Sequence, residues 1–322
     1  MNASRSVAVV IPSWNSLGLL PRCLGSLVDQ GAEIELMVVD NGSEDGTADY
    51  LQREGIPHVS LPRNLGFAAA VNLGAARTSA PAVLVLNADT VLEPGCAGAL
   101  AAALEADPSL GGVQPRILQI EEEGAPPAVE TARLYSAGQA LLADGRAVEE
   151  GAGEPQSPGF LRPREIFGVC GAACLLRREL FAELGGYDES YFLFYEDVDL
   201  NVRARIAGWR FGYVPEAVVW HVGNASWMAG FGSPGAENGR LVARNRLVTQ
   251  ARYMPLRALP RIAAVEVGAL LRAARQRRFA ATLRGKLEGL GRLPGALRAR
   301  RRLRRGGDLE RARRWLGARA GG

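Results

Sequence analysis

The chain has 322 residues, 48% of them hydrophobic, and a formal net charge of +4, which is ample for one large domain plus an appendage. It opens without a signal-peptide pattern, and no apolar run approaches the roughly 20 residues of a membrane span, so we expect neither a secretory signal nor a spanning helix. The four cysteines are Cys23, Cys96, Cys170 and Cys174, and they lack the spacing of a zinc site. We therefore expect them to be buried, reduced thiols in a cytosolic protein.

The first third of the chain alternates apolar runs with segments of helical periodicity. The runs predict strands at residues 6–12, 34–40, 58–62 and 82–89. The periodic segments predict helices at residues 17–30, 47–54 and 66–77. Strands that alternate with helices and are apolar on both faces form a parallel sheet covered on both sides, so the sequence predicts an α/β fold.

The middle of the chain, from about 120 to 163, is rich in Glu, Gly and Pro and predicts a loop-rich excursion with short strands within 132–148. Order resumes at 167–189 with a strand, a helix and a glycine turn. The pattern then predicts a helix at 196–209, strands at 210–215 and 217–226, and a helix at about 236–254.

Three polar clusters fall where predicted strands end. They are PSWN at residues 12–15, DNGS at 40–43 and NAD at 87–89. Any one of them is ordinary turn chemistry. Ligands of parallel sheets bind at the carboxyl ends of the strands, so three clusters at successive strand ends indicate a site for a nucleotide or a cation.

A further stretch, YFLFYEDVDL at residues 191–200, places Glu196, Asp197 and Asp199 directly behind an aromatic run. Acidic residues suit the first turn of a helix, and Asp199 lies four residues before Arg203, the spacing of a helical ion pair. A carboxylate beside an apolar wall is also a candidate general base.

These motifs, in this order, resemble a known family. The segments VVIPSWN, VVDNGSEDGT, RNLGFAAAVNLGA, VLNADTVLEPG, the long run from Gly168 to Ser226 and ARNRL are similar to inverting glycosyltransferases of family 2, especially the bacterial rhamnosyltransferase-like branch. The resemblance covers about residues 5–255. It implies a GT-A fold: a Rossmann-like, mostly parallel central sheet with helices on both faces. It also implies a nucleotide-binding half at about 1–118, an acceptor-side half at about 119–255 and a basic helical extension at 256–322.

The resemblance also implies site residues. Asp197 takes the place of the catalytic base, and Glu196 would orient acceptor hydroxyls or support the loop. Asp40 takes the place of the acid that accepts N3–H of uracil or thymine, with an Asx turn as the alternative. The contacts to the nucleotide sugar would be Pro12, Ser13, Asn15, Asp40, Arg63, Asn64, Gly66, Asn87 and Asp89.

The cofactor implied is Mg²⁺ or Mn²⁺, held by Asp89, with His221 either completing the metal shell or serving a structural role. Asn87 replaces the first acid of the family's Asp-x-Asp motif, which suggests a weaker metal site.

The implied reaction moves a sugar from a nucleotide diphosphate to a hydroxyl of a glycan or lipid-linked acceptor, in cell-wall or polysaccharide synthesis. The branch favours rhamnose from dTDP-rhamnose, whereas UDP-hexoses remain open because uracil and thymine present the same N3–H. A nucleotidylyltransferase would want a basic Gly-rich loop after the first strand, and this chain has PSWNSLG there, which disfavours that interpretation. A processive synthase would usually show membrane spans and a Gln-x-x-Arg-Trp motif, and the sequence has neither.

The charge is divided unevenly. Residues 252–322 hold 20 of the 38 Lys/Arg and 4 of the 34 Asp/Glu, a balance of +16, which leaves −12 for residues 1–251. The tail suits a solvated helix packed on the domain, a nucleic-acid binder or a peripheral anchor on an anionic membrane. We favour the anchor, on the inner face of the plasma membrane. The tail lacks the aromatic residues that stack on bases, so we expect no nucleic-acid partner.

The apolar residues of the tail at helical spacing are Ile262, Val265, Ala269 and Leu270, and Pro294 is predicted to divide the tail into segments. No motif indicates an oligomeric state.

Overall fold

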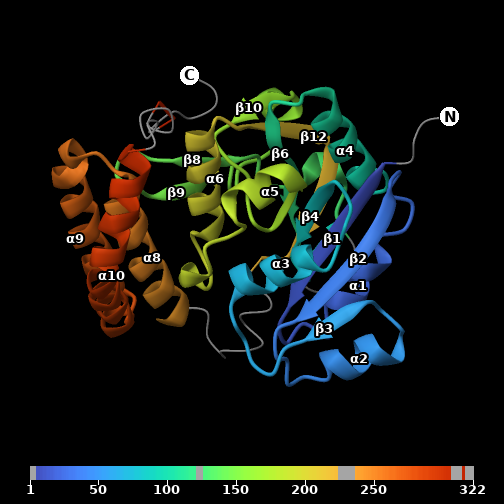
Figure 1. Cartoon of the computed structure of the whole chain (residues 1–322), viewed down its shortest axis with the longest axis horizontal. Coiled ribbons are helices and arrows are strands. Elements are labelled where there is room, and N and C mark those ends of the chain that lie inside the picture. The colour runs from blue at the N-terminus through green and yellow to red at the C-terminus, as the bar shows by residue number, and fades with distance from the viewer. Residues whose placement is uncertain (1–4, 121–125, 224–235, 306–313, 316–322) are drawn as a thin grey trace.

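A computed structural model of the chain describes residues 5–120, 126–223, 236–305 and 314–315. The end of the strand predicted to reach residue 226, a few residues of the excursion and most of the tail beyond 305 lie outside the described residues. The fold confirms the predicted α/β class, with a central sheet, helices on both faces and a helical C-terminal region (Figure 1).

The first half of the sheet is parallel. β1 (Ser6–Ser13) lies between β2 (Glu33–Asp40) and β4 (Ala82–Leu86), and β3 (His58–Ser60) extends the sheet beyond β2. Alternate residues of β1 enter different cores: Val9 packs in one cluster and Val10 in the other. The strand is therefore buried on both faces, which is why its sequence is a continuous apolar run.

The second half of the sheet is mixed. β11 (Ala173–Arg177) runs antiparallel between β4 and β6 (Leu110–Gln119), and β12 (Arg210–His221) is parallel to β6. Shorter strands pair at its margin: β5 (Thr90–Leu92), β7 (Leu134–Ser136) and β10 (Arg164–Ile166). The two strands predicted at 210–215 and 217–226 are one strand with a bulge after Val214, so that division was wrong.

Helices cover both faces. α1 (Leu20–Gly25) and α4 (Cys96–Ala106) contribute to one core, and α3 (Phe67–Ala76), α5 (Arg178–Leu184) and α6 (Glu196–Ala207) to the other. α2 (Thr47–Arg53) lies near β3 (Figure 1). The chain also makes short 3₁₀ turns at Val129–Thr131, Pro158–Leu161, Glu189–Tyr191 and Leu256–Ala258.

Three C-terminal helices form a group away from β1–β3 (Figure 1): α8 (Ala236–Tyr253), α9 (Leu259–Arg275) and α10 (Phe279–Arg305). α10 packs along α8, and it continues through Pro294, so the predicted break there was wrong. Contacts with α8 hold it on both sides of the proline. Gly289 lies against Arg244 on one side, and on the other Arg300 donates to the carbonyl of Ala251 at 3.0 Å.

The expectation of buried, reduced cysteines is met. All four cysteines are buried and unpaired. Within the described part of the chain, no helix combines the length and apolar character that crossing a membrane requires.

Candidate active site

A cavity of about 450 Å³ opens at the carboxyl ends of β1 and β4. Ser13 and Asp40 are paired in the register of β1 and β2, so the predicted polar clusters do reach one edge of the sheet. The predicted residues that line the cavity are Pro12, Ser13, Asn64, Gly66, Asn87, Asp89, Glu196, Asp197 and His221. Asn15, Asp40 and Arg63 are outside its lining.

Asn15 and Asp40 tie the strand-end loops together. The Asn15 backbone N–H donates to Ser43 Oγ at 2.9 Å, and the Asn15 side-chain oxygen accepts from Glu44 N–H at 2.8 Å. Asp40 is buried, and its carboxylate accepts from Ser43 N–H at 3.2 Å, which is the Asx-turn alternative. Base recognition by Asp40 therefore stays a prediction.

Asn41 is a cavity residue that the sequence reasoning did not single out. Its amide donates to Asn64 Oδ1 at 3.0 Å and to the Gly66 carbonyl at 3.1 Å. Gly66 has φ 94°, and a Cβ there would lie 2.5 Å from the Phe192 carbonyl oxygen. Only glycine permits this approach, which seats the loop before α3 directly on the aromatic run.

Asp89 and His221 lie together on neighbouring segments. His221 Nε2 is 3.1 Å from Asp89 Oδ1 and 3.4 Å from Asn87 Nδ2. Ligand atoms about 2.1 Å from Mg²⁺ or Mn²⁺ lie about 3 Å apart in an octahedral shell, so this pair fits a shared cation. Asp89 is the single carboxylate of the set, and Asn87 would add a neutral oxygen ligand if its amide turned to place Oδ1, instead of Nδ2, toward His221.

Three buried polar atoms of the cavity wall have no hydrogen-bond partner among the described residues. They are Ser13 Oγ, Glu196 Oε2 and His221 Nδ1. Buried polar atoms are normally paired, so atoms of this kind mark the positions where a polar ligand would complete the site.

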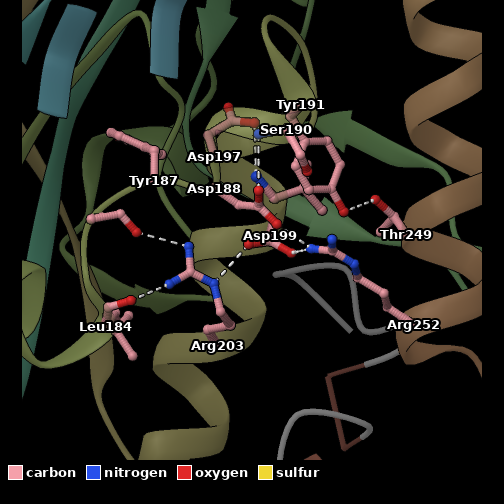
Figure 2. Close-up of polar contacts among 12 residues, drawn as sticks. Leu184, Tyr187, Asp188, Ser190, Tyr191, Asp197, Asp199, Arg203, Thr249 and Arg252 are labelled. Carbon is pink, nitrogen blue, oxygen red and sulfur yellow. Dashed lines mark hydrogen bonds and ion pairs between the residues drawn. The ribbon is translucent and has the colours of Figure 1, made fainter. Parts of the chain in front are cut away.

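The three carboxylates at the start of α6 have separate environments. Asp199 is fully buried and accepts from Arg203 at 2.7 Å, from Arg252 at 2.9 Å and from the Tyr253 hydroxyl at 2.6 Å. Figure 2 shows Asp199 between the two arginines. This confirms the predicted pairing with Arg203, and it makes Asp199 a link between α6 and α8.

Asp197 and Glu196 line the cavity instead. Asp197 accepts from the Gly171 N–H at 3.0 Å, the Val198 N–H at 2.8 Å and the Gln139 amide at 3.0 Å. Burial raises the pKa of Asp197, although these three donors oppose the rise. Burial, followed by the charge of Asp197, raises the pKa of Glu196 well above its usual value.

The aromatic run is a strained loop. Phe192, Phe194 and Tyr195 have φ of 66°, 66° and 71°, a region that residues with a side chain rarely adopt. The Asn245 amide of α8 lies 2.9, 2.8 and 2.7 Å from the carbonyl oxygens of Tyr191, Leu193 and Phe194. Each strained residue costs about 1–3 kcal/mol, so the surrounding structure must hold the loop. Asn245, in the ARNRL motif, stabilises the loop through these hydrogen bonds.

The excursion delivers further cavity residues that the sequence reasoning missed: Tyr135, Gln139, Arg146 and Glu149. The irregular composition of this region gave no periodicity from which to place them. The ligand atoms of Glu149, Cys170 and Asp197 lie within 4.8 Å of one another. Mg²⁺ and Mn²⁺ prefer oxygen ligands, so a group that includes the Cys170 thiol suits them less well than Asp89 with His221 does.

Comparison with known proteins agrees with this architecture. The family described as "Glycosyl transferase family 2" matches residues 8–185, and the chain belongs to this family. It is 32% identical over 211 residues to the N-acetylglucosaminyl-diphospho-decaprenol L-rhamnosyltransferase of Mycobacterium tuberculosis, covering 58% of this chain and 66% of that one. It is 27% identical over 227 residues to an N-acetylglucosaminyltransferase of Azorhizobium caulinodans, covering 66% of this chain and 53% of that one. The chain thus matches slightly under two thirds of the first relative and about half of the second.

A solved structure shares the fold. GalNAc-T7 with UDP, GalNAc and Mn²⁺ superposes with a TM-score of 0.57 at 19% identity, over 78% of this chain and 51% of that one. This likeness extends to the fold alone and supports the GT-A architecture.

Proposed function

We propose that the protein is an inverting glycosyltransferase that moves a sugar from a nucleotide diphosphate to a hydroxyl of a glycan or lipid-linked acceptor. The observation that carries this proposal is Asp197, a carboxylate in the cavity wall with a raised pKa, in the same cavity as Asp89 and His221. Family membership supports the reaction class, and the rhamnosyltransferase relative favours rhamnose as the sugar, for which the donor that we propose is dTDP-rhamnose. The N-acetylglucosaminyltransferase relative keeps a UDP-hexose donor as the alternative.

In the proposed reaction, the acceptor oxygen attacks the anomeric carbon as Asp197 takes the hydroxyl proton. The new oxygen–carbon bond forms while the bond from the anomeric carbon to the diphosphate breaks, and the nucleoside diphosphate leaves. A single displacement of this kind inverts the anomeric centre. A positioned general base contributes about 10²–10⁴-fold to such a step.

Other residues take supporting roles in this proposal. Glu196 has an unpaired buried oxygen that can receive an acceptor hydroxyl, and Phe192 and Phe194 offer an apolar wall to a sugar ring. Asp89, helped by His221 and Asn87, would hold Mg²⁺ or Mn²⁺, which when bound neutralises charge on a leaving diphosphate.

The test is a screen of sugar nucleotides for donor hydrolysis and for transfer, with Mg²⁺ and with Mn²⁺. dTDP-rhamnose is expected to react best, and UDP-hexoses are the competing donors. Asp197→Asn should keep donor affinity while turnover falls by about 10²–10⁴-fold. Near-normal turnover in Asp197→Asn would remove the base assignment, and release of pyrophosphate from a nucleoside triphosphate would favour a nucleotidylyltransferase.

We further propose that α9 and α10 rest on an anionic membrane surface. α9 directs a charged residue inward and apolar residues outward. Glu266 faces inward and pairs with Arg246 of α8 at 2.7 Å, whereas Val267 and Leu271 are 57% and 59% exposed. α10 exposes apolar side chains at helical spacing along its outer face: Phe279, Leu283, Leu287, Leu290 and Leu297. Exposed arginines accompany both rows, and an anionic leaflet complements an apolar face of this kind.

A further inference from the structure

Glu149 enters the candidate active site from a hairpin outside the family's motifs. β8 (Gln139–Leu141) pairs with β9 (Ala147–Glu149), and their register sets Gln139 opposite Glu149. Both side chains line the cavity beside Asp197. The hairpin therefore places a second carboxylate next to the proposed base.

One amide joins the two carboxylates. Gln139 Nε2 donates to Asp197 Oδ2 at 3.0 Å and to Glu149 Oε1 at 3.1 Å. The amide cannot flip without loss, because Gln139 Oε1 accepts from Asn201 of α6 at 2.9 Å. The orientation of Asp197 is thus coupled to the position of Glu149.

Among the described residues, the side chains that donate hydrogen bonds to Glu149 are neutral, Ser136 and Gln139. Ser136 of β7 donates to Glu149 Oε2 at 2.6 Å, and that serine hydroxyl accepts from Gln114 of β6 at 2.9 Å. The remaining neighbours are the protonated Cys170 thiol and Tyr135 phenol, and the charged neighbour is Asp197 itself. Two carboxylates this close, without a cation between them, do not both ionise readily.

Building on the proposed function, we propose that Glu149 is a positioning residue for the base: it orients Asp197 through the Gln139 amide and, by its own charge state, sets the basicity of Asp197. Glu149 touches the substrate in no step of this scheme. It acts through Gln139 and through the electrostatic field at Asp197.

The direction of the effect follows from the order of ionisation. Burial, and then the charge of Asp197, raises the pKa of Glu149 to about 7. Below that pH the pair carries one negative charge, on Asp197. As the pH rises through about 7, Glu149 loses its proton, and the added negative charge raises the pKa of Asp197 and makes it a stronger base.

The test compares pH profiles of kcat/KM for the full chain and for Glu149→Gln. The wild-type profile should rise through an inflection near pH 7 that Glu149→Gln lacks. One pKa unit is about a tenfold change in basicity, so the two profiles should diverge by about three- to tenfold above pH 7. Glu149→Asp, which can still ionise, should retain an inflection. Glu154→Gln removes an exposed carboxylate of the same excursion and should match the wild type.

The outcomes separate the two proposals. If Asp197→Asn is inactive and Glu149→Gln keeps the wild-type inflection, the role of Glu149 is overturned while the base assignment stands. A loss of activity in Glu149→Gln that is equal at every pH would also overturn it, since that is the mark of a merely structural residue. If Asp197→Asn transfers sugar normally, the proposed function itself fails.

Discussion

Two carboxylates two residues apart in α6 should respond in opposite ways to the same substitution. Asp199→Asn removes a buried charge that receives hydrogen bonds from Arg203, Arg252 and Tyr253. A hydrogen bond to a charged group is worth about 1.5–3 kcal/mol, and losing one partner of a buried ion pair costs about 3–5 kcal/mol. Asn keeps one acceptor oxygen, and Arg252 keeps Asp188 at 2.6 Å, so we expect a loss of about 3–5 kcal/mol rather than the sum of the three bonds.

Asp197→Asn should not destabilise the fold. Burial raises the pKa of Asp197, so the folded chain binds this proton more tightly than the unfolded chain does. The resulting stability is present below the unfolded-state pKa of about 3.9 and is lost as the pH rises through the folded-state pKa. Above the folded-state pKa the ionised carboxylate is a cost to folding that asparagine does not carry.

Urea unfolding at pH 7, followed by circular dichroism, measures both variants beside their transfer activity. Asp199→Asn should unfold at clearly lower urea with an unchanged slope, and Asp197→Asn should unfold at the wild-type concentration or above while being inactive. Equal stability of Asp199→Asn and the wild type, or a loss in Asp197→Asn as large as that in Asp199→Asn, would refute this division of roles.

Three more predictions concern the metal, the loop and the tail. Chelation with EDTA should abolish transfer, and Asp89→Ala should weaken donor binding only when Mg²⁺ or Mn²⁺ is present; full activity in chelator would show that the site works without metal. Asn245→Ala releases the strained loop and should lower kcat by about ten- to a thousandfold, since two full hydrogen bonds of about 1–2 kcal/mol each are lost; unchanged kcat would mean that the loop holds itself. Val267→Ser with Leu271→Ser should reduce sedimentation with anionic vesicles by tenfold or more, roughly the effect of removing two half-exposed apolar side chains. The exposed Val28→Ser is the matched control, and vesicle binding that survives the double substitution would exclude this face of α9.

The sequence predicted those strands whose residues are all buried, because such a strand reads as a continuous apolar run. β4 is apolar throughout, and β1 is apolar between its terminal serines, because both faces of each strand are buried. β6 and α4 were not predicted. β6 contains two glycines and Pro115, which argue against a central strand; the proline is tolerated because β12 bulges beside it, next to Val214. That compensation lies about a hundred residues away in the chain and leaves no local signal.

In the candidate site, too, the sequence placed only the residues that a local pattern marks. Strand-end residues such as Ser13 and Asp89 could be placed because a parallel sheet brings the ends of its strands to one edge. Gln139 and Glu149 could not be placed, because they reach Asp197 through the pairing of two three-residue strands in a segment without periodicity. Asp40 was assigned to base recognition from its place in a motif, and the structure adds a backbone partner, Ser43, that a turn residue would also have.

The tail shows why composition alone could not assign its surfaces. The sequence marked Ile262 as part of an apolar face, and in the fold Ile262 is buried in a core shared by α6, α8 and the hairpin. The exposed apolar residues of α9 lie on another side, and the charged Glu266 is directed inward to Arg246, which itself lines the cavity. Truncation near Met254 would therefore open a core and release a cavity residue together. Paired substitutions on the outer face, such as Val267 with Leu271, separate membrane contact from the integrity of the site.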